Sequence, residues 1–193
     1  MLVWLGMISP LVFWLTTFVC GMLLGDYNGL SNLVSELGAQ GTRTQYLFSF
    51  GLVLSAFLNV LFVSSLWRIC KEWKQSIVPL LPMFCYSFLA GPALVPMPLP
   101  LHGVVGMPFP LILLAPLFAL LFWKKDLMSP ALKMIAVAGL IVMLLGFLIF
   151  APGILSGYHG LKQRFLYAGW TMWSSAISMA FLRIHPRPPL QTL

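Results

Sequence analysis

The run "QYLFSFGLVLSAFLNVLFVSSLW" occupies residues 45–67 and contains no charged side chain. A helix needs about 20 mainly apolar residues to cross the roughly 30 Å hydrocarbon core of a bilayer. This run meets that requirement, and the rest of the chain has the same character. Of its 193 residues, 60% are hydrophobic and 8% are charged, whereas soluble domains carry about 25% charged residues. The sequence therefore predicts an integral membrane protein.

Six apolar segments are long enough to span a membrane. We place them at about residues 2–24, 45–67, 77–98, 102–123, 134–156 and 165–183. They leave no room for an extramembrane domain, and backbone groups in hydrocarbon must pair within their own segment. The expected fold is all-α: one domain over residues 1–193, built as a compact bundle of six transmembrane helices.

Lysine and arginine are distributed unevenly between the two sets of junctions. One set, with the C-terminal tail, holds eight basic residues, and the other set holds three. The first set is Arg68, Lys71, Lys74, Lys124, Lys125, Lys133, Arg183 and Arg187; the second is Arg43, Lys162 and Arg164. Basic residues collect in cytoplasmic loops. We therefore expect a multi-pass protein of the cell membrane with both termini cytoplasmic.

The net charge of +7 has the same origin. The sequence has no basic stripe interleaved with aromatic residues, so we expect no nucleic-acid partner. The expected partner is the lipid bilayer itself. The three cysteines lie far apart without a CxxC pattern and read as small buried apolar residues.

Proline marks the junction between the third and fourth apolar segments. Nine of the 15 prolines fall between Pro79 and Pro116, and "VPMPLPLHG" places three of them at every second position. This spacing forbids regular helix. We expect a tight extended corner at the outer surface and kinks in both flanking helices, which free backbone carbonyl groups to line a cavity.

The first outer loop, "NGLSNLVSELGAQGTR" at residues 28–43, carries a helical pattern. Its apolar residues fall at i, i+3, i+4 and i+7, and Gly38 follows as a helix stop. The apolar stripe is Leu30, Leu33, Val34 and Leu37. We expect a short amphipathic helix of about two turns, lying flat as a lid over the outer ends of the spans.

Glu36 falls near the C-terminal end of this expected helix, where the helix dipole disfavours an anion. We therefore expect a cationic partner on the same side: Arg43, Lys162, Arg164 or a protonated histidine. A solvated carboxylate or a structural ion pair is the alternative, and an exposed pair contributes only about 0–1 kcal/mol.

Two further stretches hold outer polar residues. His102 opens the fourth segment directly after the proline corner, and "YHGLKQRF" opens the sixth with His159, Lys162, Gln163 and Arg164. A lone histidine is more often an interfacial residue than a ligand. Lys162 can extend to the surface. Arg164 lies inside the apolar run, where leaving it unpaired would be costly, and its planar fork suits a carboxylate or a phosphate.

These stretches resemble a known family. "YNGLSNLVSELGAQGT", "LPLHGVVG" and "GLKQRFLYAGWTMW" are similar to segments of the bacterial and archaeal domain of unknown function 998 family, in the same order along the chain. The resemblance implies six helices and an outer polar cluster. It does not imply an activity. It points to Ser35, Glu36, Gly38, His102, Gln163 and Arg164.

Three functions fit these patterns. The first is binding or transport of a small polar or anionic ligand, or a lipid headgroup, at an outer pocket. The second is an accessory or structural membrane subunit. The third is an intramembrane enzyme using Glu36, His102 and Arg164, for which no catalytic motif is present. The candidate ligand-binding residues are Ser35, Glu36, His102, His159, Gln163 and Arg164. No ligand spacing predicts a metal site, and no cofactor is expected; the oligomeric state stays open.

Overall fold

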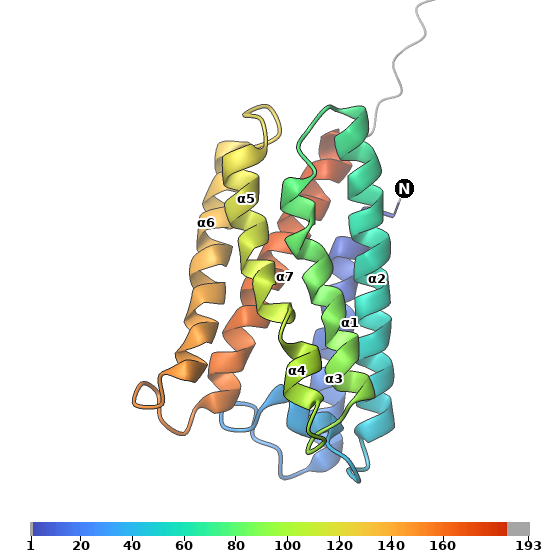
Figure 1. The fold of residues 1–193 in the computed structure, drawn as a ribbon, viewed down its shortest axis with the longest axis vertical. Coiled ribbons are helices and arrows are strands. Elements are labelled where there is room, and N and C mark those ends of the chain that lie inside the picture. Colours follow the sequence, from blue (N-terminus) through green and yellow to red (C-terminus); the bar gives the residue numbers. More distant parts are fainter. Residues whose placement is uncertain (1, 185–193) are drawn as a thin grey trace, which may run out of the picture.

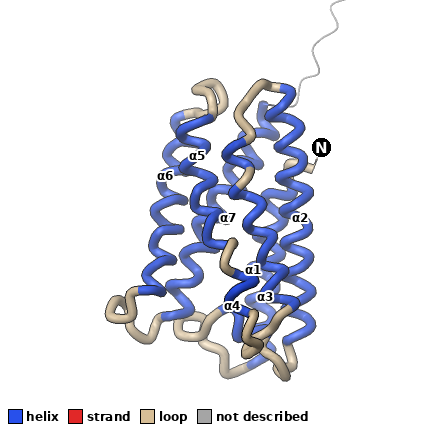
Figure 2. The backbone as a smooth tube through the Cα atoms, viewed as in Figure 1, coloured by secondary structure: helices blue, strands red, loops and turns tan. Residues whose placement is uncertain are grey.

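A computed structural model describes residues 2–184, which form only helices and loops (Figures 1 and 2). The six expected helical segments fit the observed elements. They are α1 (Leu5–Leu24), α2 (Gln45–Glu72), the segment Val78–Leu94, the segment His102–Phe122, the segment Pro130–Phe150, and α7 (His159–Ile184). Four of them, all except Val78–Leu94 and α7, are long and apolar enough to cross a membrane. Four such helices indicate a membrane-embedded helical protein.

The third and fourth segments are not continuous α-helices. The third consists of the 3-10 helices η2 (Val78–Leu80) and η3 (Pro82–Leu89), then α3 (Ala90–Leu94); the fourth consists of α4 (His102–Gly106), the 3-10 helix η4 (Phe109–Leu113) and α5 (Leu114–Phe122). Proline explains these interruptions because it lacks the N–H that a regular helix needs. A side-chain amide on α2 compensates in part, since Asn59 Nδ2 donates to the Met83 carbonyl at 2.9 Å.

The fifth segment also tightens towards its end, where α6 (Pro130–Leu145) passes into the 3-10 helix η5 (Gly146–Phe150). Its start is well defined, because the Ser129 side chain accepts a hydrogen bond from the Leu132 N–H and Pro130 occupies the first turn.

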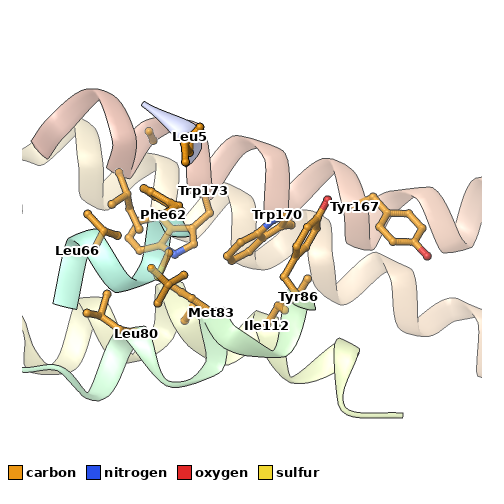
Figure 3. Close-up of a cluster of buried hydrophobic side chains, with 14 of the residues drawn as sticks. Leu5, Phe62, Leu66, Leu80, Met83, Tyr86, Ile112, Tyr167, Trp170 and Trp173 are labelled. Atoms are coloured by element: carbon orange, nitrogen blue, oxygen red, sulfur yellow. The ribbon is translucent and has the colours of Figure 1, made fainter. Parts of the chain in front are cut away.

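Helix α7 lies in the middle of the bundle, between the α1–α2 and α5–α6 sides in Figure 1. Trp170 and Trp173 of α7 are fully buried (Figure 3). The Trp170 ring stacks on Tyr86 of η3 at 5.2 Å between centroids, and Tyr167 packs against Phe13 of α1 at 4.3 Å. Because other helices shield α7, it can carry more polar residues than a helix that faces lipid.

The two ends of the bundle differ in charge. One end, called the basic end, holds loops 73–77 and 123–129 and both described chain ends. Every described Lys and Arg there is exposed: Arg68, Lys71, Lys74, Lys124, Lys125, Lys133 and Arg183. The expected contribution of Arg187 lies outside the described residues. The other end, called the cap end, is formed by residues 25–44, 95–101 and 151–158 and is the lower end in Figure 1.

Glycine permits the closest approach of two helices, α6 and α7. A Cβ atom on Gly169 would lie 2.5 Å from the Gly139 carbonyl oxygen and 2.8 Å from the Met143 backbone nitrogen. Neither of these backbone atoms can turn away, so the spacing between the two helices requires glycine at residue 169.

Gly169→Ala should therefore lower the thermal unfolding temperature in detergent, with a loss of about 1–3 kcal/mol typical of overpacking. Gly153→Ala is the matched control, because a Cβ there would meet no atom within 4 Å. Equal unfolding temperatures for the two variants would contradict the close contact between α6 and α7.

Candidate functional site at the cap end

The first loop is less helical than its sequence pattern predicts. The prediction of a two-turn amphipathic helix is wrong, because only the 3-10 helix η1 (Val34–Gly38) forms. Val34 and Leu37 are buried as expected, but Leu30 is 50% exposed. The reason lies in α7, whose Gly160 N–H donates to the Ser31 carbonyl at 3.2 Å and whose Leu161 N–H donates to the Leu30 carbonyl at 2.9 Å. These carbonyl groups serve the first turn of α7 instead of a helix of their own.

This shorter helix changes the environment of Glu36. Because η1 begins at Val34, the carboxylate lies in the first turn and not near a C-terminus. Its Oε1 accepts from the Leu33 N–H at 2.8 Å, and its Oε2 accepts from Asn32 Nδ2 at 2.7 Å. A carboxylate is favourable at this position, where helix N–H groups are free. The expected cationic partner is absent among residues 2–184, because these two hydrogen bonds take its place.

Arg164 binds the same loop from α7. Its Nη1 donates to the Asn32 carbonyl at 3.2 Å and to the Gly160 carbonyl at 3.1 Å, and its Nη2 donates to the Tyr27 hydroxyl at 2.5 Å. The guanidinium also lies 5.6 Å from the centre of the Tyr27 ring. Tyr27 in turn donates to the Leu33 carbonyl at 3.1 Å. Burial raises the pKa of Tyr27 above its ordinary value, although Arg164 acts in the opposite direction, so the hydroxyl stays protonated as a donor.

Gln163 completes the connection between α7 and η1. Its Oε1 accepts from the Val34 N–H at 2.7 Å, and Gly160 leaves no space for a side chain beside the Asn32 and Gly29 carbonyl groups. The "SELGA" and "GLKQR" stretches therefore hold each other. We call this group the η1–α7 bracket: Tyr27, Asn32, Glu36, Gln163 and Arg164.

The other two polar residues at the start of α7 lie apart from the bracket. We expected that Lys162 could extend to the surface, but it does not. It is fully buried, and its Nζ donates to the Ala151 carbonyl at 3.2 Å. The first turn of α7 directs this side chain towards the end of η5 and away from the surface. His159 is exposed and has no hydrogen-bond partner among the described residues.

An apolar pocket of about 250 Å³ lies beside the bracket. Its wall is mainly apolar and comes from η1, α2, η3, α3, α4, η4, η5 and α7. The polar groups that line it are Ser35, His102, Gln163 and Tyr167; no charged residue does so. Three of the candidate residues named from the sequence therefore share one pocket, whereas Glu36, His159 and Arg164 do not line it.

His102 presents a defined tautomer to this pocket. Its Nδ1 lies 2.7 Å from the Val95 carbonyl oxygen, which can only accept, so Nδ1 carries the hydrogen. In the neutral ring Nε2 is then a hydrogen-bond acceptor. The proline corner supplies that carbonyl, so the turn over 95–101 fixes the ring at the start of α4.

A second hollow, which we call the α1–α7 cleft, lies on the other side of Tyr27 and Arg164. It measures about 470 Å³ and is more open than the apolar pocket. Its lining residues are Trp14, Thr17, Phe18, Gly21, Met22, Gly25, Tyr27, Gly29 and Arg164. Arg164 thus faces a different space from His102, and the two do not form one active site with Glu36.

Two important residues were not identified from the sequence. Tyr27 anchors Arg164, and Tyr167 lines the pocket with its hydroxyl 3.5 Å from Gln163 Nε2. The spacing of Gln163 and Tyr167 is i, i+4 on one helix, which is the available signal. Tyr27 stands next to Asp26 in a loop and carries no periodic signal. No group of three or more His, Cys, Asp or Glu residues within 2–184 could hold a metal ion.

The fold and the cap define a class: a bundle of apolar helices, closed at one end by a loop that is hydrogen-bonded to the last helix. The family model described as "Protein of unknown function (DUF998)" matches residues 7–180, so the chain belongs to that family. Searches of curated proteins and of solved structures found no match.

The bracket predicts a specific loss of stability. Arg164→Lys keeps the charge but removes the guanidinium group that reaches both Asn32 and Tyr27. The thermal unfolding temperature in detergent should therefore be lower than that of the wild type. The expected loss is about 1.5–3 kcal/mol, as for hydrogen bonds to a charged group. Arg68→Lys, on the exposed surface of α2, is the matched control and should lie within about 0.5 kcal/mol of wild type. Similar unfolding curves for both variants would mean that the bracket contributes little.

Proposed function

We propose that this chain is a multi-pass protein of the bacterial inner membrane that binds an amphiphile in the apolar pocket. The ligand has an apolar body and an uncharged polar group. The observation that carries the proposal is the composition of the pocket: mainly apolar walls, a few polar side chains, and no lining charge. Ligand sites are typically built in this way.

The polar groups suit hydrogen bonding and not charge pairing. His102 Nε2 accepts, the Ser35 hydroxyl donates or accepts, and Tyr167 is a phenol. Gln163 is partly committed, because its Oε1 already accepts from Val34. The two cations at the start of α7, Lys162 and Arg164, lie outside the lining. The supported ligand is therefore an alcohol, amide or ester attached to an apolar chain.

Exposed apolar residues flank the pocket on two elements. Phe147 and Phe150 of η5 line it and are 36% and 78% exposed, and Met107, next to α4, is 71% exposed. In a bilayer such surfaces face lipid, so the ligand can enter sideways between α4 and η5. A volume of about 250 Å³ is smaller than the roughly 300–1,000 Å³ of pockets for drug-sized ligands, which favours a single acyl chain or a small amphiphile.

One observation favours a second candidate, an accessory or structural subunit. Three of the six residues to which the family resemblance points, Glu36, Gln163 and Arg164, make hydrogen bonds that hold the cap together. A family whose motifs serve only folding needs no ligand. The enzyme hypothesis has less support, because Glu36 and Arg164 lie outside the pocket that His102 lines.

Ligand retention tests the pocket. Gly103 lines it, and a Cβ there would meet no atom within 4 Å, so Gly103→Leu should fill the pocket without disturbing the fold. We expect native mass spectrometry to find a co-purified amphiphile on the wild type and at least tenfold less on this variant. Gly153→Leu, in open space on a loop, is the control. A wild type with no ligand, or equal retention by all three proteins, would favour the structural subunit.

The orientation proposal rests on the exposed basic residues of the basic end. With the native cysteines replaced, Ser156→Cys at the cap end should react with a membrane-impermeant maleimide on intact cells. Lys125→Cys at the basic end should react only after the membrane is permeabilised. The reverse pattern would place the cap in the cytoplasm.

A further inference from the structure

We propose that the α1–α7 cleft is a second site, which binds the phosphate group of an anionic phospholipid. This inference is independent of the apolar pocket, because the two spaces have different lining residues. The ligand chemistry is an oxyanion of the phosphate type. A lipid headgroup and free phosphate share that chemistry, and the experiment below distinguishes them.

Arg164 offers an unused N–H donor beside the cleft that it lines. Its Nη1 has two protein partners and its Nη2 has one, whereas its Nε–H has none among the described residues. The guanidinium group of an arginine is a strong donor to the oxygens of a phosphate or carboxylate. The bracket therefore fixes the guanidinium of Arg164 and leaves its Nε–H available to an oxyanion.

Gly29 keeps one side of this guanidinium uncovered. A Cβ atom there would lie 3.4 Å from Arg164 Nη2, 3.5 Å from Cζ and 3.7 Å from Nε. Any side chain at residue 29 would therefore lie against the group that lines the cleft.

A second arginine, Arg43, lies beside Gly25 of the cleft but is not itself a lining residue. Arg43 is exposed, and a Cβ on Gly25, a lining residue of the cleft, would lie 3.6 Å from Arg43 Nη2. Arg43 makes no ion pair within residues 2–184. Of the carboxylates nearby, Asp26 is exposed and Glu36 is already bound by Leu33 and Asn32. Arg43 therefore adds positive charge beside the cleft that Arg164 lines, which favours the approach of an oxyanion.

The remaining wall explains why the oxyanion belongs to a lipid. Phe18 and Met22 of α1 line the cleft and are 65% and 68% exposed, and Trp14 lies one turn further along the helix. An acyl chain can follow this apolar surface while the phosphate meets the arginines at the cap end. Free phosphate would gain nothing from these side chains. A zwitterionic phospholipid would gain less than an anionic one from the positive charge of Arg43 and Arg164, because its own cationic group offsets its phosphate.

Lipid retention by the full chain in mixed nanodiscs tests the proposal. Phosphatidylglycerol and phosphatidylcholine are supplied in equal amounts, and the lipids retained on ejection are counted by native mass spectrometry. The wild type should prefer phosphatidylglycerol. Arg43→Gln should reduce that preference about fivefold, as expected for one cation near a lipid surface. Arg68→Gln, which changes another exposed arginine at the basic end, is the matched control.

A second arm of the experiment distinguishes a lipid headgroup from free phosphate. Met22→Ser should weaken the retention of phosphatidylglycerol. The unfolding temperature should be the same in sodium phosphate as in sodium chloride of equal ionic strength. Stabilisation by phosphate alone that is lost in Arg43→Gln would assign the site to free phosphate. No lipid preference and no phosphate effect, or equal losses in Arg43→Gln and Arg68→Gln, would overturn the site.

Discussion

The cap of this protein depends on hydrogen bonds between the first loop and the start of α7, which are about 130 residues apart in the chain. The free N–H groups at the start of α7 take the carbonyl groups of Leu30 and Ser31, and Gln163 and Arg164 take up the polar groups beside them. A backbone group that is buried without a partner would be costly. The first loop and the start of α7 therefore supply each other's hydrogen-bond partners.

This arrangement also places both candidate sites. Val34 and Gln163 form part of the apolar pocket, and Tyr27 and Arg164 form part of the α1–α7 cleft. The bracket is the wall between them. Charge is concentrated on the cleft side and absent from the lining of the pocket, so the two spaces suit different parts of lipid chemistry: a phosphate group in one and an uncharged amphiphile in the other.

The sequence predicted the number and approximate position of the helices because an apolar run about 20 residues long has few alternatives. It also indicated α7, which is less apolar than its neighbours because it lies inside the bundle. The first loop was harder. The spacing of Leu30, Leu33, Val34 and Leu37 fits a helix, but α7 competes for the carbonyl groups that the first half of that helix would need. No local pattern contains this information.

The same limit applies to the site. The sequence singled out Ser35, His102, Gln163 and Arg164, but it could not divide them between two spaces. Lys162 and Arg164 differ by two positions on α7, which places one in the interior and the other against the loop. Tyr27 was missed because its importance comes from a contact with a residue 137 positions away.

The most direct test of the account is hydrogen exchange at the Val34 amide in the wild type and in Gln163→Leu. The Val34 N–H donates to Gln163 and to no other described group. The account predicts a slowly exchanging amide in the wild type and fast exchange at Val34 in the variant. Exchange in the middle of α2 should not change. An equally protected Val34 amide in both proteins would show that the loop is held by something other than α7, and it would contradict the central claim.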